Sequence, residues 1–430
     1  MGTVTAATAD SFTRAWVSVE RTGKISHALK NAWQDSPLYP ELIAESTEKR
    51  LGSISAQDLE TLMAQYPDSA AIANLRWKKL FRLGRANWHK DFLFLYRPTD
   101  SVELNCYKLE ARYRLKQAKD ADHREAVRLW THGKSQPKAC DTLFSLIQQR
   151  GLITKEVRLR RIDHALEKRQ LQLARWLAKP LDQSATKHIN AWAQARRQPA
   201  AFLTKQAAQF PEWVDMAASR LASRNPDRLL ELIKNREIPD AVREQAILGA
   251  ARTMAINLDP AAAPLLRMDL PSHPILNHWR VRYFIHFQEW ADVLTAISQL
   301  APEERNEIEW NYWASRALAM TGNSDLAFEG FRKVAESNSW YGFLAADYLG
   351  IAYNLAPKTK RPPETLIAKV NERTDVTVAR LLFEEGLTVM ARRQWDFVTG
   401  RLDEEEQKAA AILANRWNWH SRSAVTAHQS

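Results

Sequence analysis

The apolar periodicity of this chain constrains its fold more than any other feature. Nearly every segment carries apolar residues at the spacing i, i+3, i+4 and i+7 that lines one face of a helix. In one of them, Leu75, Leu80 and Leu83 lead to Gly84, where we expect the helix to end. Convincing alternation of apolar and polar residues, typical of strands, is missing. Short breaks rich in Pro, Gly, Asn or Asp separate the periodic segments. The pattern predicts an all-α protein built from antiparallel helix pairs.

One segment resembles a tetratricopeptide repeat, in which small residues let two short helices pack closely. Trp310 and Ala317 lie on the expected first helix, residues 321–323 form the turn, and Phe331 and Val334 lie on the second. Other segments share this rhythm without a fixed period. We therefore expect an irregular, TPR-like α-superhelix in which each helix pair packs only against its neighbours.

Composition excludes several protein classes. Of the 430 residues, 45% are hydrophobic and 26% are charged, which is typical of globular rather than disordered proteins. The glycine content, 13 of 430 residues, is less than half of the usual ~7%. This scarcity weighs against nucleotide-binding α/β folds and β-sandwiches. The 61 Lys and Arg exceed the 50 Asp and Glu, and the net charge of +11 favours an anionic partner.

The N-terminal sequence leaves the cellular compartment open. No apolar run reaches the ~18–20 residues of a membrane span, so we expect no such span. Residues 1–10 are small and polar and lack the basic and apolar regions of a signal peptide. Read literally, they indicate a cytosolic protein. Alternatively, a signal peptide has been removed and a Met added.

The two cysteines, Cys106 and Cys140, also allow two interpretations. No histidine pair lies near them at ligand spacing, so we do not expect a structural zinc site. They are either two unrelated buried thiols or one disulfide. A disulfide would close a loop of about 34 residues and would contribute about 3–4 kcal/mol in an oxidising compartment.

No catalytic constellation stands out in the sequence. The GxSxG, Walker, HExxH and CxxC motifs are all absent. His278 and His286 lie among aromatic residues, which favours ordinary packing or a surface position over a functional pair. Residues 404–406 are adjacent glutamates, which point in different directions around a helix and indicate a solvated face. We expect no catalytic, cofactor-binding or metal-binding residue in this chain.

The 16 tryptophans allow a ligand-binding and a structural interpretation. Aromatic faces can stack on sugar rings or bases, but Trp also fills the space between helices. Most of a group of seven tryptophans have the spacing of a helix core, and we expect these residues to pack in the core. These are Trp77, Trp88, Trp130, Trp176, Trp192, Trp310 and Trp395.

Basic residues cluster in the middle of the chain, at Lys155, Arg158, Arg160 and Arg161, with a further pair at 196–197. Such a cluster could contact phosphates. The sequence has no recognition-helix motif, zinc finger or aromatic sheet signature. RNA binding is therefore a minor hypothesis, and we expect no nucleic acid partner.

Two features mark the C-terminal part. Residues 357–363 contain three prolines and three positive charges and cannot continue a helix, so we expect a domain boundary there. Residues 421–430 are polar and unpatterned, which is typical of a chain that stops rather than of one that is capped.

Several stretches resemble the soluble lytic murein transglycosylases of Gram-negative bacteria. The most specific runs from Leu129 to Asp141, LWTHGKSQPKACD, and is similar to the family's L-W-x-x-G-K-S-Q-P-x-A-C-D segment. Residues 35–40, 309–313 and 340–346 are similar to the family's Y-P-L-Y-P, E-W-x-Y-W and F-Y-x-x-x-A-A patterns. The similarity covers nearly the whole chain and is weakest at about 150–270.

The resemblance implies an architecture. We expect a flexible segment at 1–24 and a superhelical domain at 25–363 that forms a U or ring. A small helical linker domain is expected at 364–430, and we expect it to be incomplete. The resemblance also implies that Cys106 and Cys140 form a disulfide and that the protein is periplasmic.

The family's chemistry depends on a glutamic acid in an E-S motif, followed by G-L-M-Q and A-Y-N-A-G segments. That Glu protonates the glycosidic oxygen and accepts a proton from the sugar's 6-hydroxyl, so the product is a 1,6-anhydro sugar. These segments are absent here, and Glu45 and Glu336 match only the dipeptide with the Ser that follows each. We therefore expect the lysozyme-like catalytic domain to be missing and the chain by itself to be inactive.

The leading hypothesis is the non-catalytic superhelical portion of a soluble lytic murein transglycosylase. It would bind peptidoglycan and position it while the missing domain cleaves the MurNAc-GlcNAc β-1,4 bond. The alternatives are a periplasmic TPR-like scaffold for other cell-wall enzymes and an RNA-binding helical solenoid. We expect murein strands as the partner, no cofactor and a monomer. The sequence assigns no residue to glycan contact.

Overall fold

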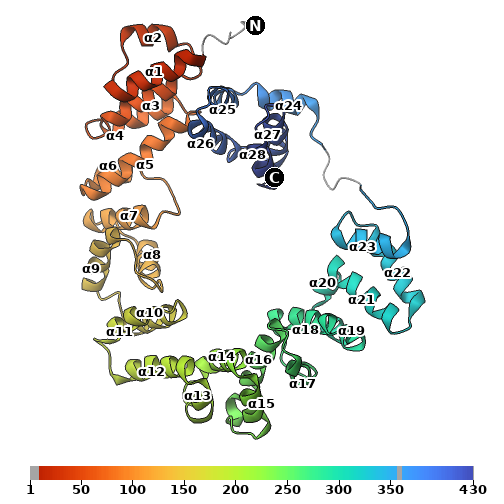
Figure 1. Ribbon diagram of the computed structural model, residues 1–430. Helices are drawn as coiled ribbons and strands as arrows, with labels where there is room; N and C mark the ends of the chain where they lie inside the picture. Colours follow the sequence, from red (N-terminus) through yellow and green to blue (C-terminus); the bar gives the residue numbers. More distant parts are fainter. Residues whose placement is uncertain (1–8, 356–360, 430) are drawn as a thin grey trace. The chain divides into compact units, whose positions relative to one another are not determined.

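The structure, a computed structural model, describes residues 9–355 and 361–429 (Figure 1). Within these ranges it contains 28 α-helices, a few short 3₁₀ turns and no strand. The predicted all-α class is confirmed. Over the same ranges, no helix combines the length and the apolar character needed to cross a membrane.

The chain divides into two compact units, one of residues 1–157 with 360–430 and one of residues 158–359. The N-terminal helices of the first unit are α1 (Ala9–Thr22), α2 (His27–Trp33), α3 (Tyr39–Lys49), α4 (Ala56–Gln65), α5 (Ala70–Arg85), α6 (His89–Leu95), α7 (Val102–Arg114), α8 (Asp120–Trp130) and α9 (Asp141–Gln149). Its C-terminal helices are α24 (Glu364–Asn371), α25 (Thr374–Glu384), α26 (Thr388–Thr399), α27 (Glu404–Arg416) and α28 (His420–Gln429).

The second unit is a succession of short helices. They are α10 (Lys155–Glu167), which begins just before the boundary, α11 (Leu171–Ala178), α12 (Gln183–Arg197), α13 (Pro199–Lys205), α14 (Val214–Arg224), α15 (Pro226–Lys234), α16 (Asp240–Ile256), α17 (Ala263–Leu266), α18 (Pro274–His286), α19 (Trp290–Ser298), α20 (Pro302–Arg305), α21 (Ile308–Met320), α22 (Ser324–Ala335) and α23 (Trp340–Leu349).

One apolar core of the first unit joins the two ends of the chain. Phe12 and Val19 of α1 and Leu42 of α3 pack in the same cluster as Trp395 of α26. The expectation of a flexible segment at 1–24 is therefore wrong for α1, and residues 1–8 lie outside the described part. Apolar residues at positions 12, 16 and 19 give α1 one apolar face, which the C-terminal helices bury.

The C-terminal end of the chain is also helical as far as Gln429, although residues 421–430 show no apolar pattern in the sequence. Helix α28 buries Thr426, whose hydroxyl accepts a 2.9 Å hydrogen bond from the indole Nε1 of the fully buried Trp395. A polar residue thus satisfies a buried donor, a role that hydrophobic patterning does not reveal.

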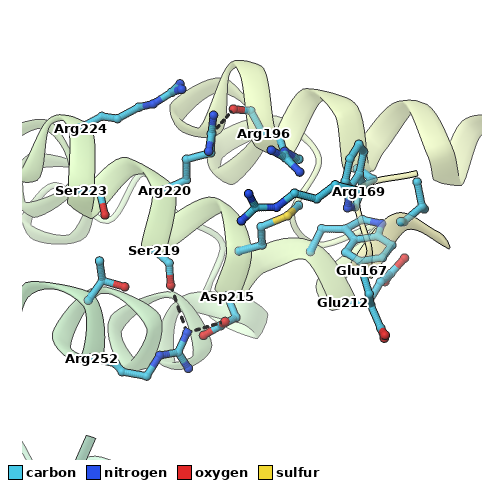
Figure 2. Close-up of a pocket in the computed structure, with 15 residues that line it drawn as sticks. Glu167, Arg169, Arg196, Glu212, Asp215, Ser219, Arg220, Ser223, Arg224 and Arg252 are labelled. Carbon is cyan, nitrogen blue, oxygen red and sulfur yellow. Dashed lines mark hydrogen bonds and ion pairs between the residues drawn. The ribbon is translucent and has the colours of Figure 1, made fainter. Parts of the chain in front are cut away.

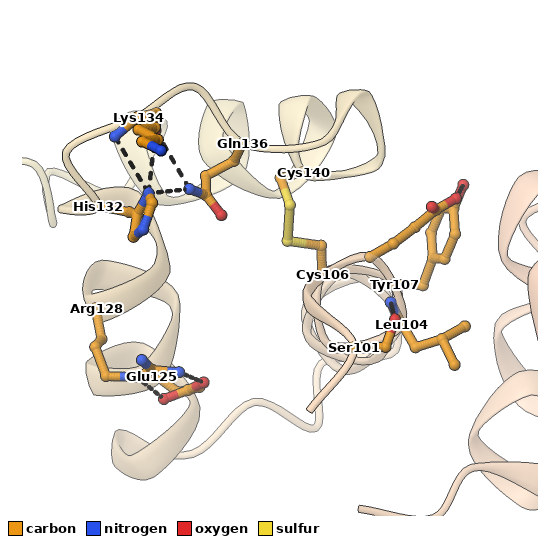
Figure 3. The surroundings of a disulfide bond; sticks show 11 residues. Ser101, Leu104, Cys106, Tyr107, Glu125, Arg128, His132, Lys134, Gln136 and Cys140 are labelled. Carbon is orange, nitrogen blue, oxygen red and sulfur yellow. Dashed lines mark hydrogen bonds and ion pairs between the residues drawn. A yellow bond between two sulfur atoms is a disulfide. The ribbon is translucent and has the colours of Figure 1, made fainter. Parts of the chain in front are cut away.

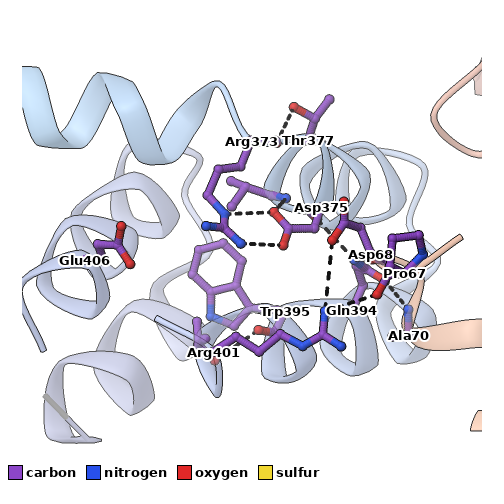
Figure 4. A network of polar contacts seen from close by, with 12 residues as sticks. Pro67, Asp68, Ala70, Arg373, Asp375, Thr377, Gln394, Trp395, Arg401 and Glu406 are labelled. Carbon is purple, nitrogen blue, oxygen red and sulfur yellow. Dashed lines mark hydrogen bonds and ion pairs between the residues drawn. The ribbon is translucent and has the colours of Figure 1, made fainter. Parts of the chain in front are cut away.

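A buried glutamine connects the C-terminal helices to the start of α5 (Figure 4). The Gln394 side chain is fully buried, and its Oε1 accepts a 2.8 Å hydrogen bond from the main-chain N–H of Ala70. Its Nε2 donates to the main-chain oxygens of Asp68, at 2.8 Å, and of Asp375, at 3.3 Å. The first backbone N–H groups of a helix have no partner within that helix, and Gln394 binds one of them at the start of α5. This one side chain therefore links the N-terminal and the C-terminal helices of the first unit.

An ion pair lies at the same junction. Arg393 Nη2 of α26 donates a 3.0 Å hydrogen bond to Glu41 Oε2 of α3. Only 2% of the Glu41 side chain is exposed, and its second carboxylate oxygen has no partner. Burial raises the pKa of Glu41 to about 7, although the attraction of Arg393 lowers it in part.

Glycine lets α5 and α7 approach closely in the first unit. Gly84 was expected to end its helix, but it lies buried inside α5, which continues to Arg85. A Cβ atom at this position would overlap the ring of Tyr107 on α7. Close helix contact, rather than a turn, explains this residue.

The predicted helix pair at 310–334 is confirmed in the second unit. Helices α21 and α22 flank a turn at residues 321–323, where Gly322 has a φ of +87°. Gly330 of α22 faces Ser315 of α21 so closely that a Cβ on Gly330 would overlap the Ser315 hydroxyl. Small residues therefore set the distance between the two helices.

The proline-rich boundary predicted at 357–363 falls largely outside the described residues, which exclude 356–360. Of its described part, residues 361–363 are not helical, and Pro363 is the N-cap of α24. The structure thus has no helix across the described part of this stretch.

Glu41 predicts a specific pH dependence of stability. The folded state holds the Glu41 proton up to about pH 7, whereas an unfolded glutamate releases it near its ordinary pKa of 4.5. The folded state therefore binds more protons between these values, and the free energy of unfolding falls as the pH rises through this window. Glu41→Gln removes this loss, which is at most about 3 kcal/mol, and flattens the profile. Urea unfolding at pH 5 and pH 8 measures the effect, and an unchanged pH profile in the variant would contradict it.

Candidate functional site: an arginine pocket

A cavity of about 690 Å³ opens in the second unit among α10, α12, α14 and α16 (Figure 2). An adjoining cavity of about 450 Å³ shares five of its lining residues. We call the two together the arginine pocket, because their walls include Arg169, Arg196, Arg197, Arg220 and Arg224.

Helical spacing places most of these side chains in the pocket. Arg220 and Arg224 lie four residues apart on α14, and Trp192 and Arg196 lie four apart on α12, so each pair shares one helix face. Arg220 Nε donates a 2.6 Å hydrogen bond to the main-chain oxygen of Arg196. This carbonyl belongs to the last turn of α12, which has no helical donor for it. The bond therefore orients Arg220 and joins α14 to α12.

The lining of the pocket includes a buried aromatic ring. Trp192 is only 5% exposed, and the guanidinium carbon of Arg196 lies 4.8 Å from the centre of its ring. This cation–π contact holds Arg196 over the indole. Arg196 and Arg220 are half-buried, whereas Arg169, Arg197 and Arg224 are exposed at the rim.

The positive charge of the pocket is not compensated within the described residues. None of the five arginines forms an ion pair with a carboxylate there, whereas nearby Arg228 pairs with Glu231 and Arg252 pairs with Asp215 at 2.7 Å. Burial lowers the pKa of Arg196, and repulsion from the neighbouring arginines of the pocket lowers it further.

The carboxylates of the pocket lie apart from Arg220 and Arg224 in Figure 2. Asp215 is held by Arg252, and Glu212 accepts a 3.0 Å contact from His188. His188 also contacts Asp163 at 2.7 Å, and this hydrogen bond is the main reason that its pKa is raised. Two of the three carboxylates therefore already have cationic partners, and the third, Glu167, is exposed.

The sequence identified only part of this site. Of the predicted basic cluster, residues 196–197 line the pocket, but Lys155, Arg158, Arg160 and Arg161 are not among its lining residues. Arg169, Arg220 and Arg224 were not among the predicted residues. The spacing of Arg220 and Arg224 was a usable signal, whereas their approach to Arg196 depends on how α12 and α14 pack.

The tryptophans divide into two groups. Trp130, Trp192, Trp310 and Trp395 are buried, as predicted. The prediction of core packing is wrong for three others, because spacing places a residue on a helix face but does not tell whether another helix covers it. These are Trp77, Trp88 and Trp176, which are 41%, 54% and 57% exposed.

The remaining candidates have ordinary structural surroundings. His278 lies 3.1 Å from Glu304 and packs on Trp310, and His286 packs on Phe287. The glutamates at 404–406 form a largely solvated face at the start of α27, where Lys408 contacts two of them. In the described ranges, no three His, Cys, Asp or Glu side chains are grouped to hold a metal.

Cys106 and Cys140 form a disulfide in the first unit (Figure 3). Cys106 lies on α7, and Cys140 ends a 3₁₀ turn before α9, with 5.0 Å between their Cα atoms. Both side chains are fully buried. Leu129 and Trp130, at the start of the sequence run that ends at Asp141, are also buried.

Comparison with known proteins agrees with this architecture. Residues 369–430 match the family model of the soluble lytic murein transglycosylase L domain. A solved structure of an inactive mutant of the lytic transglycosylase Slt from Pseudomonas aeruginosa covers 97% of this chain, with 26% sequence identity and a TM-score of 0.81. This chain is therefore similar to the soluble lytic murein transglycosylases. It covers 70% of the Pseudomonas structure.

Curated relatives extend the comparison. The soluble lytic murein transglycosylase of Salmonella typhimurium is 24% identical over 406 residues, which are 90% of this chain and 62% of that protein. The one from Escherichia coli is 24% identical over 402 residues, or 89% and 61%. This chain therefore spans less than two thirds of the length of these family members.

Solved structures with lower identity show the same superhelical fold. The 70-kDa soluble lytic transglycosylase of Escherichia coli matches 98% of this chain and 69% of that one, with a TM-score of 0.78 and 20% identity. A complex of the 70-kDa enzyme with bulgecin A gives a TM-score of 0.77 at 20% identity. The predicted family and the predicted superhelical fold are thereby confirmed.

The uncompensated charge of the arginine pocket predicts an unusual stability effect. Arg224→Gln removes one repelling charge and should raise the thermal unfolding midpoint by about 1–2 °C at low ionic strength, with a smaller rise in high salt. Arg160→Gln is the matched control, because Arg160 follows Glu156 by four residues on α10 in a favourable arrangement. Calorimetry of both variants at two salt concentrations measures the effect. A lower midpoint for Arg224→Gln at low salt would contradict it.

The disulfide predicts a second stability effect. Replacing both Cys106 and Cys140 by Ala releases a loop of 34 residues in the unfolded chain. The free energy of unfolding should fall by about 3–4 kcal/mol. Urea unfolding of the double variant, compared with the oxidised protein, measures this loss. Equal stability of the two proteins would show that the cross-link contributes nothing.

Proposed function

We propose that this chain is the murein-holding part of a soluble lytic transglycosylase. In this proposal, residues 25–363 are the superhelical domain, and residues 364–430 are the linker domain. The observation that carries it is the match to the Pseudomonas lytic transglycosylase over 97% of the chain at a TM-score of 0.81. The match of residues 369–430 to the family's L domain supports the assignment of the linker.

The chain's charge supports an anionic ligand. Murein carries carboxylates, and the arginine pocket presents cationic side chains that lack carboxylate partners in the described ranges. We propose that murein strands bind to the second unit and are thereby positioned for cleavage of the β-1,4 bond between MurNAc and GlcNAc. The chain by itself holds the glycan but does not cleave it, because its 430 residues lack the G-L-M-Q and A-Y-N-A-G segments of the family.

The compartment follows from the same proposal. Murein is a cell-wall polymer, so the site of action is the periplasm. The disulfide between Cys106 and Cys140 supports this location, because structural disulfides persist in oxidising compartments.

Two measurements on the whole chain test this function. The protein should co-sediment with purified murein sacculi, and chromatography of the supernatant should reveal no anhydro-muropeptides above a protein-free blank. Failure to sediment would refute the holding role. Release of anhydro products would refute the claim that this chain does not cleave.

A protein-scaffold function is the second candidate, because the helices that resemble a tetratricopeptide repeat expose large apolar side chains. Leu326 and Phe328 of α22 are 58% and 52% exposed, and Trp340 at the start of α23 is 70% exposed. Patches of this kind favour contact with another protein, here a cell-wall enzyme. Replacing both Leu326 and Phe328 by Ser should abolish capture of such an enzyme and leave murein sedimentation intact.

A further inference from the structure

The arginine pocket concentrates charge in a way that the rest of the chain avoids. Five other arginines of the second unit are paired with carboxylates, as Arg267 is with Asp292 at 2.8 Å. Like charges that surround one hollow repel each other, and this repulsion acts against the folded state. Stability therefore does not explain the cluster, whereas the binding of an anion would compensate it.

The side chains are also arranged for recognition. Arg196 is held on Trp192, and Arg220 is held on the last turn of α12, so two guanidinium groups are oriented before a ligand arrives. A guanidinium group can form two parallel hydrogen bonds to one carboxylate. Arg169, Arg197 and Arg224 remain exposed at the rim, where they can reach a ligand from several sides.

We propose that the arginine pocket binds the carboxylate groups of the peptides that branch from murein strands, and so recognises peptide-bearing glycan. This inference rests on the proposed function, which concerns murein as a whole. It adds which part of murein is recognised, namely the branching peptides, and which residues recognise it. Arg196 and Arg220 are the oriented ligands of the carboxylate, and Arg224 is the rim contact.

The form of the pocket favours a short branch over a continuous polymer. A hollow of about 690 Å³ has room for a few amino-acid residues. The sugars of a glycan backbone are largely uncharged, so the charge of the pocket would contribute little to holding them. The carboxylates of the peptides provide the complementary charge.

Nucleic acid fits the same pocket poorly. Stacking of bases requires accessible aromatic faces, but Trp192 is 5% exposed and Arg196 lies over its ring. Glu167 lines another part of the cavity, and its exposed carboxylate would repel the closely spaced phosphates of a polynucleotide. A peptide that carries both kinds of charge can bind the arginines through its carboxylates and Glu167 through an ammonium group.

Binding of soluble murein strands to the full chain tests the proposal. Three preparations of the strands are compared. The first has intact peptides, and in the second the carboxylates have been converted to amides. In the third, an amidase has removed the peptides, and the lactyl carboxylates that this hydrolysis frees on MurNAc have then been converted to amides. Arg224→Gln and Arg197→Gln change exposed side chains at the rim, and Arg160→Gln removes the same charge outside the pocket. Thermal unfolding confirms that each variant is folded.

We expect intact strands to bind tightest and amidation to abolish most of the binding. Each rim variant should weaken the binding of intact strands by about tenfold, while Arg160→Gln changes it little. The two rim variants should bind amidated strands as the unaltered protein does, because that residual binding does not use the carboxylates.

The outcomes separate this inference from the proposed function. If the protein binds all three strand preparations equally, or if the rim variants bind intact strands normally, the peptide-reading role is wrong and the holding of murein remains. If no preparation binds, both the peptide-reading role and the holding of murein are wrong. If the rim variants lose binding to a single-stranded RNA probe but not to murein, the pocket serves nucleic acid instead.

Discussion

In a chain made only of helices, backbone hydrogen bonds are used between residues about four apart and cannot join distant segments. Over the described residues, contact between helices therefore depends on side chains, and on small residues such as Gly84 and Gly330 where helices come close. A helix end offers a further kind of contact, because its backbone groups can bond to a side chain from a distant segment. Gln394 reaches the free N–H of Ala70 across more than 300 positions of sequence and so ties the last helices to the first.

The all-α class, the helix pair of α21 and α22 and the family were predictable, because periodicity and motif residues are local properties of a sequence. The roles of α1 and α28 were not. Phe12 of α1 packs in the core that contains Trp395, and Thr426 of α28 accepts a hydrogen bond from Trp395. Phe12 lies hundreds of residues from Trp395 in the sequence, whereas Thr426 is 31 residues from it. No pattern within either segment indicates that it packs on this core.

The same limit applies to the candidate site. The pair at 196–197 was visible as a basic cluster, but its partners Arg169, Arg220 and Arg224 come from other helices. Sequence spacing also could not tell the buried Trp192 from the exposed Trp176, because both lie on regular helices. Which faces are covered is decided by packing of the whole unit. The pocket's unpaired charge emerges only when those helices are assembled.

The disulfide has a consequence for how the chain responds to proteolysis. Cys106 and Cys140 enclose α8 and its flanking turns in a covalent ring of the chain. A protease that cuts the backbone once within this ring leaves both pieces connected through sulfur, so the molecular mass stays nearly unchanged until a reductant is added. A single nick in this segment would therefore open the ring without releasing the helices on either side.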